Sequence, residues 1–292
     1  MNSQRKLWWF RFSFVLPALL IFLIVSYIPF LSTLYLSLTN WDGISAPEFI
    51  GLRNFSELTQ DRRLIQSGVN TLWILLYVTL FMSSIALLLA LALNKKFRSQ
   101  SFLRTAFYLP QILSLVVVSA VWSGILQYYG NFNALLEKLG LGYLIRDWLG
   151  TIESALPAVI AISTWQGIGF ATIIFLAGLQ SVPKEVYEAA EMDGARGWRL
   201  LTKIIMPLLM PSITIVVFLS IVASLKFFDM PYVMTNGGPG DATATLALVI
   251  YDYAFMYRKM GYATAAGFVL MILICTFTFI QLYFMRKREV EL

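Results

Sequence analysis

Residues 71–93 read TLWILLYVTLFMSSIALLLALAL, and this stretch contains no charged side chain. A helix that crosses the hydrocarbon core of a membrane needs about 20 mainly apolar residues. A single charge near the centre of such a helix costs roughly 2.5–3.5 kcal/mol on the insertion scale. The strands of a membrane barrel would be about half as long and would alternate apolar with polar residues, unlike this stretch. Residues 71–93 are therefore predicted to cross a membrane as a helix.

The composition extends this prediction to the whole chain. Of its 292 residues, 59% are hydrophobic and only 13% are charged, whereas soluble domains usually carry about 25% charged residues. Charge-free windows recur at residues 12–41, 64–94, 105–136, 154–183, 204–225 and 260–285. The sequence predicts one all-α polytopic membrane domain over residues 1–292, whose six transmembrane helices lie at residues 12–34, 71–93, 107–127, 156–179, 212–233 and 263–284.

The residue types exclude several kinds of chemistry. Because the chain has no histidine, it cannot form an imidazole base, a zinc–histidine site or a Ser-His-Asp triad. The lone Cys275 can neither close an internal disulfide nor form a metal site by itself. We therefore expect no catalytic residues and no metal. A secondary transporter stays an alternative class, although the predicted helices lack the intramembrane acids that such transporters usually need.

The placement of Lys and Arg predicts an orientation. Fourteen of the 22 basic residues lie in the N-terminus, the 94–104 loop, the 180–210 segment and the C-terminus. Since basic loops stay on the cytoplasmic side, both termini and the 180–210 segment are predicted to be cytoplasmic. This distribution accounts for the net charge of +6, and no nucleic-acid partner is expected. The first apolar run exceeds the core of a cleaved signal peptide, so it is predicted to be an uncleaved span.

The segment 183–211, PKEVYEAAEMDGARGWRLLTKIIMPLLMP, carries the most informative pattern. Pro183 suits the first position of a helix, good helix formers follow it, and Gly194 can end that helix. An exposed surface of small and apolar residues, surrounded by acids, is predicted at Val186, Ala189, Ala190 and Met192. Such a surface would allow another protein to approach closely. The alternative is an ordinary amphipathic loop lying at the membrane interface.

The segment resembles the EAA loop of the membrane subunits of binding-protein-dependent ABC importers. The resemblance rests on Glu188-Ala189-Ala190, Asp193-Gly194-Ala195 and Ile204-Ile205-Met206-Pro207, in which Met206 replaces the usual leucine. It extends over about residues 11–286, with Asn70-Thr71 and Thr235-Asn236-Gly237-Gly238-Pro239 among the matching positions. It is closest to sugar-importing permeases of the maltose and glycerol-phosphate types.

The resemblance implies a set of partners. The chain would form half of a pore with a second, similar permease, and it would work with two ATPase subunits and an extracytoplasmic solute-binding protein. The EAA loop, residues 183–207, would couple the pore to an ATPase through Glu188, Ala189, Ala190, Asp193 and Gly194. ATP and magnesium would bind to those partner ATPases. Consistently, the chain has no Walker A sequence, and the glycine-rich turn 236–240 lacks a P-loop lysine, so no cofactor is expected in this chain.

A polar face on the fourth predicted span suits a carbohydrate. Ser163, Gln166, Gly167 and Phe170 recur at helical spacing and offer a hydroxyl, an amide, bare backbone and an aromatic ring. Small and polar residues also mediate helix packing in membranes, which is the alternative. The resemblance to maltose-type permeases implies that sugar is held from this helix and from Ser220 and Ser224 on the next. Glycerol phosphate or another polyol derivative is an alternative solute.

Two charged residues lie near the outer end of the fifth predicted span. Lys226 and Asp229 are three residues apart and are predicted to form an interfacial ion pair beside an outer gate, with the lysine stem reaching along the membrane interface. Because an ionisable residue within a span is a functional candidate by default, Lys226 could instead bind an acidic solute.

Overall fold

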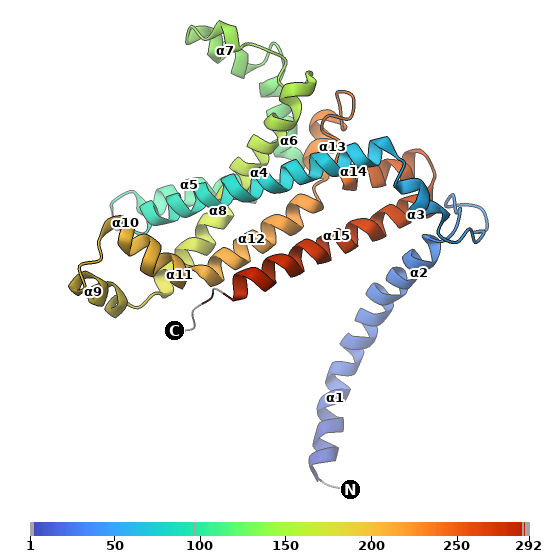
Figure 1. Ribbon diagram of the computed structural model, residues 1–292, viewed down its shortest axis with the longest axis horizontal. Coiled ribbons are helices and arrows are strands. Elements are labelled where there is room, and N and C mark those ends of the chain that lie inside the picture. The colour runs from blue at the N-terminus through green and yellow to red at the C-terminus, as the bar shows by residue number, and fades with distance from the viewer. Residues whose placement is uncertain (1–2, 96, 288, 290–292) are drawn as a thin grey trace. The chain divides into compact units, whose positions relative to one another are not determined.

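The computed structural model describes residues 3–95, 97–287 and 289, with side chains from residue 10 onward (Figure 1). Lys96 and Arg288, which the orientation prediction uses, lie outside the described residues. Throughout the described part, the only strand-like pairing is an isolated antiparallel bridge between Thr39 and Phe49. The predicted all-α fold class is confirmed.

Four continuous helical stretches are long and apolar enough to cross a membrane: Phe10–Leu36, Arg62–Leu93, Ile152–Ser181 and Met260–Arg286. Two further candidates are bent pairs of helices. Gln100–Ile112 and Leu115–Leu126 meet at 95°, and Gly197–Leu208 and Met210–Leu225 meet at 69°. If each bent pair is one span, the described residues provide up to six spans, the number expected from the sequence.

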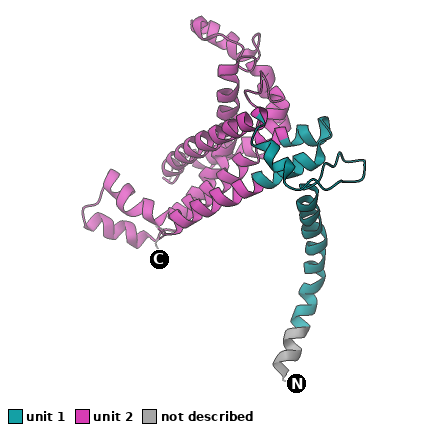
Figure 2. Ribbon diagram, turned by 45° about the vertical axis from the view of Figure 1, so that its right-hand side comes forward, with its two compact units in different colours: residues 1–61, 250–269 teal, residues 62–249, 270–292 magenta. Residues whose placement is uncertain are grey.

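The chain forms two compact units (Figure 2). Unit 1 comprises Met1–Asp61 and Ile250–Val269, and unit 2 comprises Arg62–Val249 and Leu270–Leu292. Unit 1 contains α1 (Ser3–Phe22), the π-helical segment Leu23–Tyr27, α2 (Ile28–Leu36), α3 (Arg53–Leu58) and the π-helical segment Asp252–Met256. Two helices, α14 (Leu246–Tyr251) and α15 (Met260–Arg286), contribute residues to both units.

Unit 2 contains the remaining helices. These are α4 (Arg62–Leu93), α5 (Gln100–Ile112), α6 (Leu115–Leu126), α7 (Asn131–Lys138), the 3-10 turn Gly142–Leu144, α8 (Ile152–Ser181), α9 (Lys184–Met192), α10 (Gly197–Leu200), the π-helical segment Leu201–Ile205, α11 (Met206–Leu208), α12 (Met210–Leu225) and α13 (Asp229–Thr235).

The core of unit 2 is built around α8, which packs against α4, α5 and α12. Ala86 and Ala90 of α4 share one buried cluster with Ala171 and Phe175 of α8. Lipid tails are as apolar as leucine, so membrane helices associate through close packing, which small residues permit. At Gly169 the backbone of α8 approaches the Phe107 carbonyl of α5 so closely that a Cβ would clash with it.

Two predicted spans differ from the observed helices. The third, residues 107–127, falls across the bend between α5 and α6, because Leu113 and Ser114 have extended backbone (ψ 144° and 133°). The fifth, residues 212–233, extends past the end of α12 at Leu225, and a new helix begins at Asp229. Apolar composition measures how well a segment tolerates lipid and does not show where its backbone leaves the helix. The membrane boundaries themselves stay predictions.

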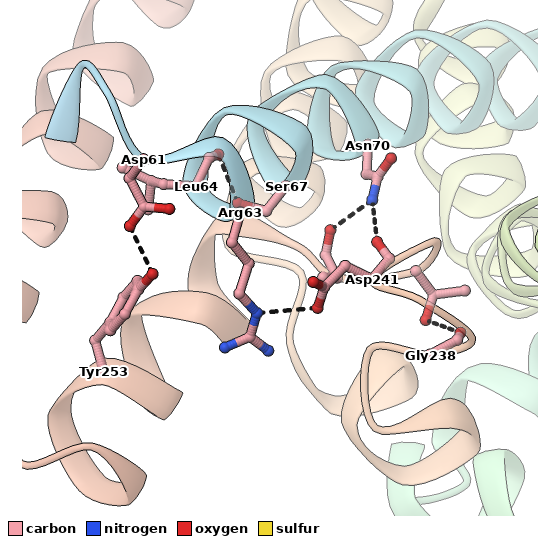
Figure 3. Close-up of polar contacts among 10 residues, drawn as sticks. Asp61, Arg63, Leu64, Ser67, Asn70, Gly238, Asp241 and Tyr253 are labelled. Carbon is pink, nitrogen blue, oxygen red and sulfur yellow. Dashed lines mark hydrogen bonds and ion pairs between the residues drawn. The ribbon is translucent and has the colours of Figure 1, made fainter.

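Polar side chains tie together the non-helical parts of unit 1. The buried amide of Asn54 donates to the carbonyl oxygens of Ser37 and Thr39, both at 2.8 Å. The carboxylate of Asp61 accepts hydrogen bonds from the hydroxyls of Tyr253 at 2.5 Å, drawn in Figure 3, and Tyr262 at 2.7 Å. These contacts connect the start of the chain to residues 250–269 within the same unit.

Candidate functional site

Unit 2 contains a cleft of about 640 Å³, lined by α4, α8, α12 and the bend between α5 and α6. This volume lies in the usual range of small-molecule sites. All six residues predicted from the sequence to contact substrate line this cleft, namely Ser163, Gln166, Gly167, Phe170, Ser220 and Ser224. The structure therefore brings them together, while their role in binding stays a prediction.

The three serines of the cleft differ in how their hydroxyls are satisfied. Ser163 donates to the Ile160 carbonyl at 3.0 Å, and Ser220 donates to the Val216 carbonyl at 2.9 Å. Ser224 is only 2% exposed, and its hydroxyl has no hydrogen-bond partner among the described residues. An unsatisfied buried polar group costs about 1–3 kcal/mol, so Ser224 is the one of these three serines whose hydroxyl carries this cost.

Gln166 and Gly167 also contribute to packing. The Gln166 amide nitrogen lies 3.4 Å from the Pro110 carbonyl and 3.5 Å from the Leu113 carbonyl, on the two sides of the Ile112 end of α5. It therefore supports the bend. The Met82 sulfur lies 2.5 Å from the position that a Cβ at Gly167 would occupy. The Gly167 backbone, which is predicted to contact the sugar, is therefore partly covered by the flexible thioether of Met82.

The sequence interpretation missed several residues of the cleft wall. Ile74, Val78 and Met82 line it from α4, and Gln111 lines it from the end of α5. The α4 residues recur at i, i+4 and i+8, which is the spacing of one helix face. Apolar residues at this spacing occur on lipid-facing surfaces too, so their sequence signal could not separate the two environments.

Lys226 and Asp229 do not form the predicted ion pair among the described residues, and a role for either residue at an outer gate stays a prediction. Both side chains line the cleft and are exposed, but they form no salt bridge among the described residues. Lys226 is the C-cap of α12, and Asp229 is the first residue of α13. Because the backbone leaves the helix between them, the i, i+3 geometry assumed in the prediction does not exist.

The loop formed by residues 236–245, which connects α13 to α14, is held against α4 by polar contacts (Figure 3). The Asn70 amide donates to the carbonyl oxygens of Asp241 and Ala244, both at 2.9 Å. The Arg63 guanidinium pairs with the Asp241 carboxylate at 2.9 Å. At the end of the loop, the Thr245 hydroxyl donates to the carbonyl of Phe227, a cleft residue, at 2.6 Å. The loop therefore connects α4 to one end of the cleft.

Replacing Asn70 with alanine is expected to lower the stability of unit 2 by about 1–3 kcal/mol, because two carbonyl groups lose their donor. The measurement is thermal unfolding of the purified complex, followed by tryptophan fluorescence. Asn131 is exposed, and its side chain forms no hydrogen bond among the described residues of unit 2, so Asn131→Ala serves as the control. Equal unfolding temperatures for the two variants would contradict this structural role for Asn70.

The segment around Glu188 forms the short helix α9, which ends in a Schellman motif. Gly194 has φ +73°, the left-handed conformation that glycine adopts without steric cost. The Ala195 amide donates to the Ala190 carbonyl at 2.9 Å, and the Gly194 amide donates to the Glu191 carbonyl at 3.0 Å. These are the two hydrogen bonds of the motif. Asp193 is its C-cap, so both Asp193 and Gly194 fix where α9 stops.

The two faces of α9 differ from the sequence prediction. Ala190 is only 3% exposed, and Val186 is half-buried, so neither belongs to the exposed surface. Ala190 turns inward because the Schellman motif brings it together with Ala195, which is buried too. The exposed face is formed by Glu185, Glu188, Ala189 and Met192. On this face the side chains of Glu185, Glu188 and Met192 therefore surround a single small residue, Ala189.

Tyr187 attaches α9 to the body of unit 2. It packs against the buried cluster that includes Ile205, Leu209 and Phe175. Burial raises the pKa of the Tyr187 phenol above its ordinary value. This packing places one face of α9 against a buried cluster that also contains Val216 of α12.

Comparisons with known proteins agree with this architecture. Residues 82–290 match the family described as binding-protein-dependent transport system inner membrane component. The chain is 32% identical over 289 residues to the probable starch degradation products transport system permease protein AmyD of Thermoanaerobacterium thermosulfurigenes, covering 99% of this chain and 97% of the relative. It is also 32% identical to the multiple sugar-binding transport system permease protein MsmF of Streptococcus mutans, covering 98% of each.

A solved structure extends the similarity to three dimensions. A chain of the bacterial alginate ABC transporter, crystallised in complex with alginate pentasaccharide-bound periplasmic protein, superposes with a TM-score of 0.85. It shares 25% sequence identity, and the match covers 98% of this chain and 96% of that one. The family match, the relatives and the shared fold show that this chain is an inner-membrane protein and belongs to the family of binding-protein-dependent transport system inner membrane components.

Proposed function

We propose that the chain is a permease subunit of an ATP-driven carbohydrate importer and that the cleft holds the sugar during transport. The observation that carries this proposal is the convergence of all six sequence-predicted contact residues on one cleft. Hydroxyl and amide groups hydrogen-bond to sugar hydroxyls, and the half-exposed Phe170 ring offers a flat face for the C–H side of a sugar. Relatives named for starch products and multiple sugars support the substrate class.

The exposed face of α9 is proposed to bind an ATPase subunit. Ala189 allows close approach, and Glu188 offers a carboxylate to a basic group of that partner. Because Tyr187 of α9 packs against the buried cluster that also includes Val216 of α12, movement of the ATPase would be transmitted to a helix that lines the cleft. Rigid-body rocking of this kind is one recognised route to a conformational switch. ATP and magnesium would stay on the partner.

The rest of the assembly follows the same proposal. A second permease would complete the pore, an extracytoplasmic binding protein would deliver the sugar, and both termini of this chain would face the cytoplasm. Purification of the membrane complex tests this arrangement. Co-isolation of an ATPase and a second permease is expected, whereas ATP-independent uptake by this chain alone would indicate a secondary transporter and would contradict the proposal.

Phe170→Ala is expected to lower the initial rate of sugar uptake about two- to tenfold, the range that aromatic contacts usually contribute. The measurement is uptake by the reconstituted complex with saturating loaded binding protein. Phe279→Ala is the matched control, because Phe279 is 72% exposed on α15 and does not line the cleft. Equal rates for both variants would remove Phe170 from the sugar site.

A further inference from the structure

The charged groups of the cleft form a balanced set. Among the described residues that line the cleft, only Lys226 and Asp229 carry a charge, and the others are apolar or uncharged. Both side chains are exposed, and neither forms a salt bridge among the described residues. The cleft therefore has no net charge, and it presents one ammonium group and one carboxylate at the same end.

The backbone keeps these two groups available as separate contacts. Lys226 closes α12, and Asp229 opens α13. Between them, the Phe227 carbonyl accepts the hydrogen bond from Thr245 at 2.6 Å, which fixes the connection. The buried hydroxyl of Ser224, also without a partner among the described residues, lies two positions before Lys226. Lys226 and Asp229 thus offer a donor and an acceptor to a ligand, and the Ser224 hydroxyl lies buried before them in the chain.

We propose that Lys226 and Asp229 bind hydroxyl groups of the transported sugar and restrict the cleft to uncharged carbohydrates; this inference rests on the proposed function of the cleft. An ammonium group donates up to three hydrogen bonds, and a carboxylate accepts several. An anionic sugar would place negative charge near Asp229, and an amino sugar would place positive charge near Lys226. Each charged class is repelled by one of the two residues and attracted by the other, so it gains little net Coulomb energy to offset the desolvation of its own charge. An uncharged sugar has no such cost and hydrogen-bonds to both groups.

The first experiment identifies the solute. The binding protein that co-purifies with the complex is isolated with its natural ligand, and the released ligand is analysed by mass spectrometry. An uncharged mono- or oligosaccharide or polyol is the expected result. A uronate, a sulfonated or phosphorylated sugar, or an amino sugar overturns the inference.

The second experiment measures uptake of that solute by complexes reconstituted with each variant, normalised to the amount of assembled complex. Lys226→Gln and Asp229→Asn are each expected to lower the initial rate at least tenfold, as the loss of a hydrogen bond to a charged group does. Lys138→Gln and Glu137→Gln, on the exposed surface of α7, are control neutralisations expected to keep the wild-type rate. Unchanged rates in the two cleft variants overturn the inference.

Exchanging the two charges tests whether Lys226 and Asp229 contact the sugar or contact each other. If Lys226 and Asp229 contact different hydroxyls, the double variant Lys226→Asp/Asp229→Lys stays as slow as the single variants. Recovery of the wild-type rate would mean that they act on each other, which overturns the inference. The charge-preserving variants Lys226→Arg and Asp229→Glu are expected to be faster than the neutral ones, and the opposite order counts against the inference. Absence of ATP-dependent sugar uptake by the wild-type complex would instead contradict the proposed function.

Discussion

Glu188→Lys is expected to abolish coupled transport, lowering both uptake and the stimulation of ATP hydrolysis by loaded binding protein at least tenfold. Glu188 is exposed on α9, and its carboxylate forms no salt bridge among the described residues. The substitution should therefore leave the fold of the subunit intact. If the exposed face of α9 binds an ATPase, lysine places a positive charge where a basic group of the partner is expected, and like charges across an interface weaken binding strongly.

The measurement for Glu188→Lys has two parts. Co-purification of the ATPase reports on binding, and uptake by reconstituted complexes reports on coupling. Glu137→Lys reverses the charge on another exposed short helix, α7, and is expected to change neither quantity. A Glu188→Lys complex that assembles and transports like the wild type would exclude α9 as the coupling contact.

The fold was largely predictable because lipid imposes strict limits on sequence. Charge-free runs located the long helices, and 71–93 falls within the single helix Arg62–Leu93. The bend after Ile112 was not predictable in this way. Gln166, a residue 54 positions after Ile112, contacts both sides of the bend, because its amide nitrogen lies near the carbonyl groups of Pro110 and Leu113. A local apolar pattern contains no information about such a distant partner.

The site was predictable where polar residues stand out against an apolar background. Ser220 and Ser224 repeat at one helical turn and line the cleft together. Spacing alone misled at Lys226 and Asp229, because it assumed a helix that had already ended at Leu225. It misled again at Ala190, which the Schellman motif turns inward. Both errors concern helix ends, where hydrogen bonds outside the helix decide the direction of each side chain.

Among the glycine substitutions, Gly169→Ala is expected to lower the free energy of unfolding most, by about 1–3 kcal/mol or more, which is the usual cost of overpacking an interior. A Cβ at Gly169 would meet the backbone carbonyl of Phe107, and backbone cannot move aside as a side chain can. The added methyl group would separate α8 from α5, whose end supplies Gln111 to the cleft. Uptake should therefore fall together with stability.

Two other glycines make this prediction specific. At Gly167 the added Cβ would meet the sulfur of Met82, and a thioether side chain adapts easily, so Gly167→Ala should cost less than Gly169→Ala. At Gly124 in α6 nothing lies within 4 Å, and alanine is the better helix former by about 1 kcal/mol, so Gly124→Ala should be neutral or slightly stabilising. The unfolding temperatures of the three purified complexes should therefore decrease in the order Gly124→Ala, Gly167→Ala, Gly169→Ala. A Gly169→Ala complex as stable as Gly124→Ala would show that α8 and α5 are not in contact at this point.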